Sequence, residues 1–131
     1  MWDKRCGAAG EMTFADCELA WSNLPGQARV FRHVWNGLQR DSEKGVEREH
    51  PTQKPIALME WILRRWSNAG DLILDPYLGS GTTAIAAKRL RRHFLGFELS
   101  PEYCEIGRRR IAEVEAQPML FQSPAEQISM V

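Results

Sequence analysis

The sequence lacks any run of about 18 apolar residues, the length that a membrane-spanning helix needs, and this excludes an integral membrane protein of the helical type. The N-terminal stretch MWDKRCGAAGEM has no apolar core of the kind found in signal peptides. Cysteine is scarce, and Cys6, Cys17 and Cys104 form no closely spaced pair of the metal-binding type. We therefore expect a cytoplasmic protein with free thiols and no metal site.

The chain also lacks a basic excess, because 17 Lys and Arg residues balance 17 Asp and Glu residues. Nucleic-acid-binding domains are usually basic, so the overall charge argues mildly against one. Two local basic clusters, at 88–93 and 108–110, are interpreted as solvated helix surface rather than as a track for phosphates. The length of 131 residues, with 44% apolar and 26% charged residues, indicates one globular domain.

The N-terminal part is rich in aromatic and β-branched residues, which favour strands. Residues 13–23 and 29–37 are predicted strands, and the LPGQA sequence between them suggests a hairpin turn. The charged stretch 38–49 is predicted to be an exposed loop. Five tryptophans, two of them near the N-terminus, are expected to serve mainly in packing: Trp2, Trp21, Trp35, Trp61 and Trp66.

The rest of the chain alternates between helical and strand patterns. The pattern predicts a helix, a buried strand, an Ala-rich helix, a second buried strand and a final helix, at 54–70, 71–75, 82–92, 93–98 and 100–116. Pro55 and Pro101 suit first helical positions, and Ser100 suits an N-cap. This alternation predicts an α/β domain with a parallel sheet, whereas residues 117–131 form a tail without periodicity.

The stretch LILDPYLGSGTT, from Leu72 to Thr83, joins the first of these strands to the Ala-rich helix. Gly79 and Gly81 carry no Cβ, so we expect the backbone to approach a ligand closely there. Glu98 follows Asp75 by 98 − 75 = 23 positions and ends the next strand, where an acid can hold ribose hydroxyls. Together these features predict a site for a nucleoside cofactor.

Two cofactor classes remain open on these residues. GSGTTA fits the loose dinucleotide pattern, but Asp75 would face a doubly negative pyrophosphate, which disfavours a nicotinamide oxidoreductase. A kinase-type phosphate loop is excluded because its lysine is missing. S-adenosyl-L-methionine carries an ammonium and a sulfonium and no phosphate, so it is the favoured cofactor.

Three segments, HPTQKP at 50–55, DPYLGSGTT at 75–83 and FELSPEYCEIGRRRI at 97–111, resemble successive motifs of the β-class DNA amino-methyltransferases, and the likeness over 1–115 includes phage and prophage members. The resemblance implies a circularly permuted, Rossmann-like methyltransferase fold and methylation of adenine N6 or cytosine N4 in a bacterium or a phage-infected host. It implies double-stranded DNA as partner. It assigns the methionine end of the cofactor to Thr52, Gln53 and Lys54, and the ribose to Glu98. It assigns further cofactor contacts to Asp75, Pro76, Tyr77, Gly79, Ser80, Gly81 and Thr82. His50 is expected to be a loop or capping residue rather than a catalyst.

The catalytic quartet of that family, Asp, Asn or Ser followed by Pro-Pro and an aromatic residue, has no match in the chain, so no catalytic residue is identified. We therefore expect an N-terminally incomplete methyltransferase domain over 1–116, with a hairpin region (1–37), a loop (38–49) and a cofactor-binding half (50–116). The missing strand would leave an apolar edge open to a second copy or to a complementary N-terminal half. A cofactor- or DNA-binding module without catalysis is the alternative function.

Overall fold

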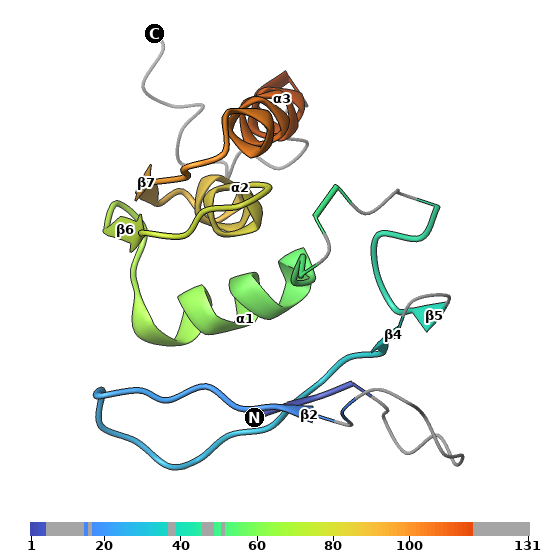
Figure 1. Cartoon of the computed structure of the whole chain (residues 1–131). Helices are drawn as coiled ribbons and strands as arrows, with labels where there is room; N and C mark the ends of the chain where they lie inside the picture. Colours follow the sequence, from blue (N-terminus) through green and yellow to red (C-terminus); the bar gives the residue numbers. More distant parts are fainter. Residues whose placement is uncertain (5–14, 16, 37–38, 46–48, 51, 117–131) are drawn as a thin grey trace, which may run out of the picture.

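The computed structural model describes residues 1–4, 15, 17–36, 39–45, 49–50 and 52–116 (Figure 1). Three helices carry most of the C-terminal part, and they are α1 (Ile56–Trp66), α2 (Thr82–Arg89) and α3 (Pro101–Ala116). The strands are short: β1 (Trp2–Asp3), β2 (Cys17–Glu18), β3 (Phe31–Arg32), β4 (Trp35–Asn36), β5 (Gln39–Arg40), β6 (Leu72–Asp75) and β7 (His93–Gly96). The predicted alternation of helix and strand from residue 54 onward is thereby confirmed, and the predicted tail, 117–131, lies outside the described residues.

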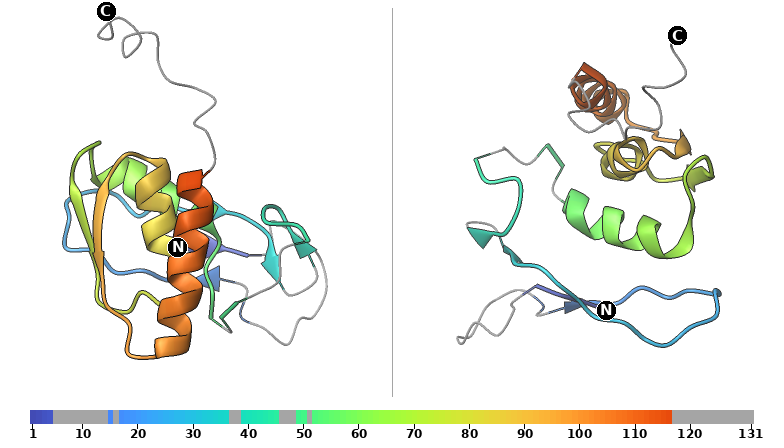
Figure 2. Two further views of the ribbon diagram at one scale, coloured as in Figure 1. Left: turned by 90° about the horizontal axis from the view of Figure 1, so that it is seen from above. Right: turned by 180° about the vertical axis from the view of Figure 1, so that it is seen from behind.

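The strands β6 and β7 pair in parallel, with Leu74 opposite Leu95, as the sequence predicts. All three helices lie on one side of this pair (Figure 2, left). Ile73 and Phe94 point toward the helices and pack on the core, whereas Leu72 and Leu74 are 63% and 62% exposed. The prediction that both strands are buried throughout was therefore wrong, because only one face of the sheet is covered by the described residues.

The N-terminal strands form a separate three-stranded sheet in the order β2-β1-β3. β1 lies in the centre, antiparallel to β2 and parallel to β3. The predicted hairpin between 13–23 and 29–37 was wrong, because the two segments do not pair directly and β1 separates them. The indole N–H of Trp2 donates to the carbonyl of His33 at 3.0 Å, which ties β1 to the segment after β3.

The stretch 38–49 was predicted to be an exposed loop, and its described part is more ordered than that. β5 pairs antiparallel with β4, placing Trp35 opposite Arg40. The side chain of Glu43 is only 13% exposed and reaches the first turn of α1, where it accepts the Ile56 N–H at 3.0 Å. This segment therefore connects the N-terminal part to the helices.

The ends of the helices follow the local sequence. Ser100 caps α3, its hydroxyl accepting the Tyr103 N–H at 3.4 Å, and Pro101 is the first helical residue, so both predictions are confirmed. α1 begins one residue later than predicted, so Pro55 is its N-cap, with extended backbone, and not its first helical residue. α1 ends at Trp66, before the predicted boundary at 70, because Ser67 leaves the helical conformation.

Two apolar clusters hold the described elements together. The larger one joins α1 to α2 and the residue after it through Ile56, Leu63, Ile85 and Leu90, and Ile111 and Val114 of α3 pack against it. The smaller one packs Trp2 and Trp35 against Leu58 of α1, which fixes the N-terminal sheet beneath that helix (Figure 1). Trp21 is 87% exposed, so its predicted packing role was wrong. None of the helices among the described residues is both long enough and apolar enough to cross a bilayer.

Candidate cofactor-binding site

The glycine loop, residues 76–81, runs from the carboxyl end of β6 to the start of α2. Gly79 and Gly81 have φ values of 54° and 83°, a left-handed backbone conformation that residues with a Cβ rarely adopt. Gly81 is the N-cap of α2, so the loop delivers the chain directly into the first turn of the helix. The N-terminal end of a helix attracts negative groups, and it is a suitable place for the carboxylate of a ligand.

Gly81 also allows the close approach of α3. A Cβ on Gly81 would lie 3.3 Å from the Cα of Gly107 and 3.6 Å from its carbonyl oxygen. The sequence predicted that this space serves a ligand, whereas the structure fills it with the backbone of α3. The physical reason is that Gly107 itself has no side chain, so the helix comes into contact with the loop.

Asp75 is the last residue of β6 and Glu98 lies two residues beyond β7, which ends at Gly96 and not at 98 as predicted, and both carboxylates contact the loop. The Oδ1 atom of Asp75 accepts the Tyr77 N–H at 3.0 Å. The Oε2 atom of Glu98 accepts the Gly79 N–H at 2.9 Å, and its Oε1 atom accepts the Ser100 N–H at 2.8 Å. The predicted placement of an acid next to the glycine loop is thus what the structure shows.

The hydrogen bonds to Glu98 favour its charged form. The Ser100 amide, and to a smaller degree the Gly79 amide, hold the pKa of this carboxyl below its usual range despite partial desolvation. An ionised carboxylate offers about four acceptor sites in total. The Glu98 carboxylate can therefore accept hydroxyl groups of a ligand while it keeps its two backbone contacts.

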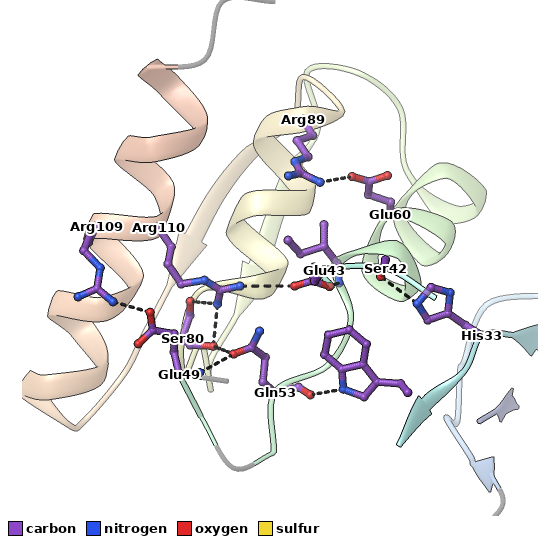
Figure 3. Close-up of polar contacts among 12 residues, drawn as sticks. His33, Ser42, Glu43, Glu49, Gln53, Glu60, Ser80, Arg89, Arg109 and Arg110 are labelled. Carbon is purple, nitrogen blue, oxygen red and sulfur yellow. Dashed lines mark hydrogen bonds and ion pairs between the residues drawn. The ribbon is translucent and has the colours of Figure 1, made fainter. Parts of the chain in front are cut away.

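Gln53 connects the Thr-Gln-Lys-Pro segment to the glycine loop. Its side chain is buried, and its Oε1 atom accepts the Ser80 hydroxyl at 3.4 Å and the Glu49 N–H at 3.2 Å (Figure 3). Ser80 and Thr82 are buried as well, so contact with a ligand through the Ser80 side chain is not favoured. Pro76 and Tyr77 lie exposed at the other end of the loop.

Lys54 and Thr52 are placed differently from Gln53. The Nζ atom of Lys54 lies 2.7 Å from Glu18 Oε2 on β2, and Lys4 Nζ lies 2.9 Å from the other oxygen of the same carboxylate. Thr52 is exposed, and both its N–H and its hydroxyl contact the Nδ1 atom of His50, at 3.1 and 3.0 Å. The ammonium of Lys54 is therefore held by a protein carboxylate in this structure.

His50 lies against the loop from the side of α3. Its ring centre is 4.3 Å from that of Tyr103, and its Cδ2 atom would lie 3.7 Å from a Cβ on Gly79. The hydrogen bond from the Thr52 N–H fits the predicted role as a loop or capping residue. Its position also makes His50 part of the wall of the candidate site, which the sequence analysis did not anticipate.

Arg110 was not among the predicted site residues, because the basic cluster 108–110 was interpreted as solvated helix surface. Arg108 and Arg109 are exposed, but Arg110 is only 8% exposed and its Nη1 atom donates to the Ser80 carbonyl at 2.6 Å and to the Ser80 hydroxyl at 2.8 Å (Figure 3). The signal was its helical spacing, since Tyr103, Gly107 and Arg110 follow each other at four and three positions on one face of α3. Burial lowers the pKa of the Arg110 guanidinium, and the negative charges of Glu43 and Glu49 partly offset this lowering.

The model of a DNA methylase family of the N6/N4 type matches residues 16–109. The chain belongs to this DNA methylase family. The match begins in the N-terminal sheet and ends in α3, so it includes β6, the glycine loop, α2 and β7, and it stops one residue before Arg110.

Relatives of this methylase chain are type II methyltransferases. It is 47% identical over 84 residues to M2.DpnII of Streptococcus pneumoniae and 44% identical over 84 residues to M2.LlaDCHI of Lactococcus lactis subsp. cremoris. In each case the match covers 63% of this chain and 31% of the relative. The methylase chain thus spans about a third of the length of these curated relatives.

Solved structures show the same fold. The SAM complex of M1.HpyAVI is 40% identical with a TM-score of 0.52, over 68% of this chain and 42% of that one. TTHA0409 of Thermus thermophilus, described as a DNA modification methylase, is 28% identical with a TM-score of 0.52, over 86% and 51% of the two chains. This methylase chain therefore has the Rossmann-like α/β fold of that family. Among the described residues, no cluster of three or more His, Cys, Asp or Glu side chains is arranged to hold a metal ion.

Proposed function

We propose that this chain binds S-adenosylmethionine in the glycine loop and forms the cofactor-binding part of a DNA amino-methyltransferase. The observation that supports this most directly is the Glu98 carboxylate, fixed by the Gly79 and Ser100 amides at the end of β7. A carboxylate held at this edge, one strand away from a glycine loop, suits the two hydroxyls of a ribose. The relatives' type II methyltransferase names and the SAM complex of a similar protein agree with the proposal.

The charges around the loop fit this cofactor better than a dinucleotide. The carboxylate of Asp75 lies at the end of β6 beside the loop and would repel a pyrophosphate, whereas Glu98 suits the ribose of either cofactor class. A ligand with an ammonium and a sulfonium is attracted by the same carboxylates. The methionine carboxylate would lie toward the positive N-terminal end of α2, with Lys54 close in sequence to Gln53, which contacts the loop.

When bound, S-adenosylmethionine supplies an electrophilic methyl group on its sulfonium sulfur. The residues of this chain would hold the ribose through Glu98 and the methionine end through the helix terminus and Lys54, and this fixes the direction in which the methyl group points. Positioning of this kind supplies much of the rate of a displacement reaction. The acceptor would be the exocyclic amino group of adenine or cytosine in double-stranded DNA.

A module that binds the cofactor without catalysis is the second candidate function. The observation that favours it is the absence, in these 131 residues, of an Asp, Asn or Ser followed by Pro-Pro and an aromatic residue. Residues 1–116 would then act as a partial methyltransferase domain, which a complementary N-terminal half would complete, whereas a second copy would only cover its exposed apolar side chains. The exposed side chains of Leu72, Leu74, Leu95 and Phe97 on the open face of β6 and β7 support such a partner.

Isothermal calorimetry tests the cofactor assignment. We expect binding of S-adenosylmethionine and of its demethylated product S-adenosylhomocysteine, and no binding of NAD. Asp75→Ala should weaken binding by about tenfold or more, because a charge-assisted contact is lost. Asp71→Ala is the matched control, since Asp71 precedes the opposite end of the same strand and accepts the Asn68 N–H there. Binding of NAD without binding of S-adenosylmethionine would refute the assignment.

A further inference from the structure

We propose that Arg110 is a positioning residue that sets the conformation of the glycine loop for the cofactor. The inference rests on the proposed function of this loop, and it concerns a residue on α3 that lies 30 positions from Ser80 in the chain. Arg110 is buried, so its charge is withheld from solvent and directed at protein atoms. It contacts Ser80 of the glycine loop on one side and Glu43 on the other.

The first contact fixes one peptide group. Arg110 Nη1 donates to the Ser80 carbonyl at 2.6 Å, and the N–H of the same peptide, on Gly81, donates to the Leu78 carbonyl at 3.0 Å. A peptide group is planar, so holding it at both sides fixes its orientation. This peptide leads directly into Gly81, whose φ of 83° starts α2. Arg110 therefore helps to aim the first turn of α2, where the carboxylate of the ligand would lie.

The second contact fixes the Ser80 side chain. The hydroxyl oxygen accepts from Arg110 Nη1 at 2.8 Å, and the hydroxyl proton is directed at Gln53 Oε1 at 3.4 Å. Arg110 thereby links α3 to the Thr-Gln-Lys-Pro segment through a single serine. Two of the segments that the site needs are held in register by this one cation (Figure 3).

The charge of Arg110 is balanced by Glu43 on the other side. Glu43 Oε1 lies 3.9 Å from Arg110 Nη2, and Glu43 Oε2 accepts the Ile56 N–H at the start of α1. Glu43 adopts a φ of 54°, which is uncommon for a residue with a side chain, and thus its segment is held in place to make these contacts. Removing Glu43 would take away the larger of the two carboxylate contributions, from Glu43 and Glu49, that offset the burial of this cation, so it should disturb the loop as well.

Calorimetry with S-adenosylmethionine tests the inference, with thermal melting of each variant measured alongside. Arg110→Met keeps the length of the side chain but removes the donors, and it should weaken binding by about tenfold or more. Arg110→Lys restores a charge without the planar guanidinium, so its affinity should fall between that of the parent chain and that of Arg110→Met. Arg108→Met is the matched control, because Arg108 is exposed and meets Glu105 on the outer side of α3. It should bind like the parent chain.

Leu63→Ala distinguishes a positioning role of Arg110 from a general contribution to stability, because it truncates a buried side chain in α1. It should lower the melting temperature while leaving the affinity close to that of the parent. If Leu63→Ala loses as much affinity as Arg110→Met at a similar melting temperature, or if Arg110→Met binds normally, the inference is wrong.

Amide hydrogen exchange supplies a measurement that does not depend on the ligand. Without ligand, the amides of 79–82 should exchange faster in Arg110→Met than in Arg108→Met, because the peptide after Ser80 has lost its anchor. Unchanged exchange would overturn the inference even if the parent chain failed to bind S-adenosylmethionine. A parent chain that fails to bind, with faster loop exchange in Arg110→Met, would instead refute the proposed function and leave the positioning contact standing.

Discussion

Gly81 and Gly107 meet across the glycine loop and α3, and a Cβ on Gly81 would come within 3.3 Å of the Gly107 Cα. Both the position and the backbone conformation of Gly81 therefore disfavour a side chain. Gly70 provides a comparison, since it has a similar φ of 88° but open space around it. The two glycines separate the cost of the backbone conformation from the cost of the contact.

Gly81→Ala should lower the melting temperature more than Gly70→Ala does. Both changes impose a left-handed residue with a Cβ, which costs about 1–2 kcal/mol, but only Gly81→Ala also pushes α3 away from the loop. Circular dichroism melting of the two variants measures the difference. Gly81→Val should additionally abolish binding of S-adenosylmethionine. Equal melting temperatures for the two alanine variants would show that the approach of α3 is not limiting.

Glu98 predicts a pH dependence with a defined sign. Its folded-state pKa is lowered, chiefly by the Ser100 amide, so its contribution to stability is complete above the unfolded value of about 4.3. That contribution should be lost as the pH falls through the lower, folded value. Melting temperatures of the parent chain should therefore decline on acidification below about pH 4.3, and Glu98→Gln should decline less. Glu105→Gln, on the outer side of α3, should keep the slope of the parent chain.

Lys54 and Glu18 predict a selective effect on one end of the cofactor. S-adenosylmethionine carries the methionine carboxylate, whereas methylthioadenosine lacks the amino-acid end. Lys54→Met should weaken binding of the first by about tenfold and leave the second unchanged. Glu18→Gln should strengthen binding of the first, because Glu18 holds the Lys54 ammonium at 2.7 Å in this structure. Calorimetry with both ligands measures this, and equal effects on the two would contradict it.

The missing Pro-Pro quartet predicts that this chain does not catalyse methyl transfer by itself. The amino nitrogen of a base is a poor nucleophile, and the quartet that would orient its lone pair has no match in the chain. Incubation with radiolabelled S-adenosylmethionine and duplex DNA should transfer no label above background. Adding the N-terminal segment of a relative, either separately or as a fusion, should restore transfer if the parts dock. Efficient methylation by the chain alone would refute the prediction.

The sequence predicted the second half of the molecule better than the first. Helical spacing in α1 and α3 and the apolar runs of β6 and β7 are local signals, and each of these elements formed within the range predicted for it, although α1 and β7 are shorter. The pairing of β1 between β2 and β3 depends on contacts between residues far apart in the chain, such as Trp2 with His33, and no local pattern encodes them. The hairpin was predicted from the turn chemistry alone, which could not reveal this third strand.

In the candidate site, too, the features that follow from local patterns were predicted, and those that depend on contacts between distant residues were not. The positions of Asp75, Gly79 and Glu98 follow from strand ends and a turn, and the structure brings them together as expected. The burial of Arg110 could not be separated from the exposure of Arg108 and Arg109 without assigning each to a helix face. The capture of Lys54 by Glu18 depends on the N-terminal sheet, whose arrangement the sequence analysis did not predict.

One face of β6 and β7 is left uncovered by the residues that the structure describes, and this makes the stability of the chain depend on its surroundings as well as on its own contacts. Leu72, Leu74, Leu95 and Phe97 remain between 48% and 63% exposed. Any molecule that binds them in the folded state, and not in the unfolded chain, raises the free energy of unfolding in proportion to the logarithm of its concentration. A melting temperature measured in dilute solution is then a lower bound, and it should rise with the concentration of whatever covers the sheet.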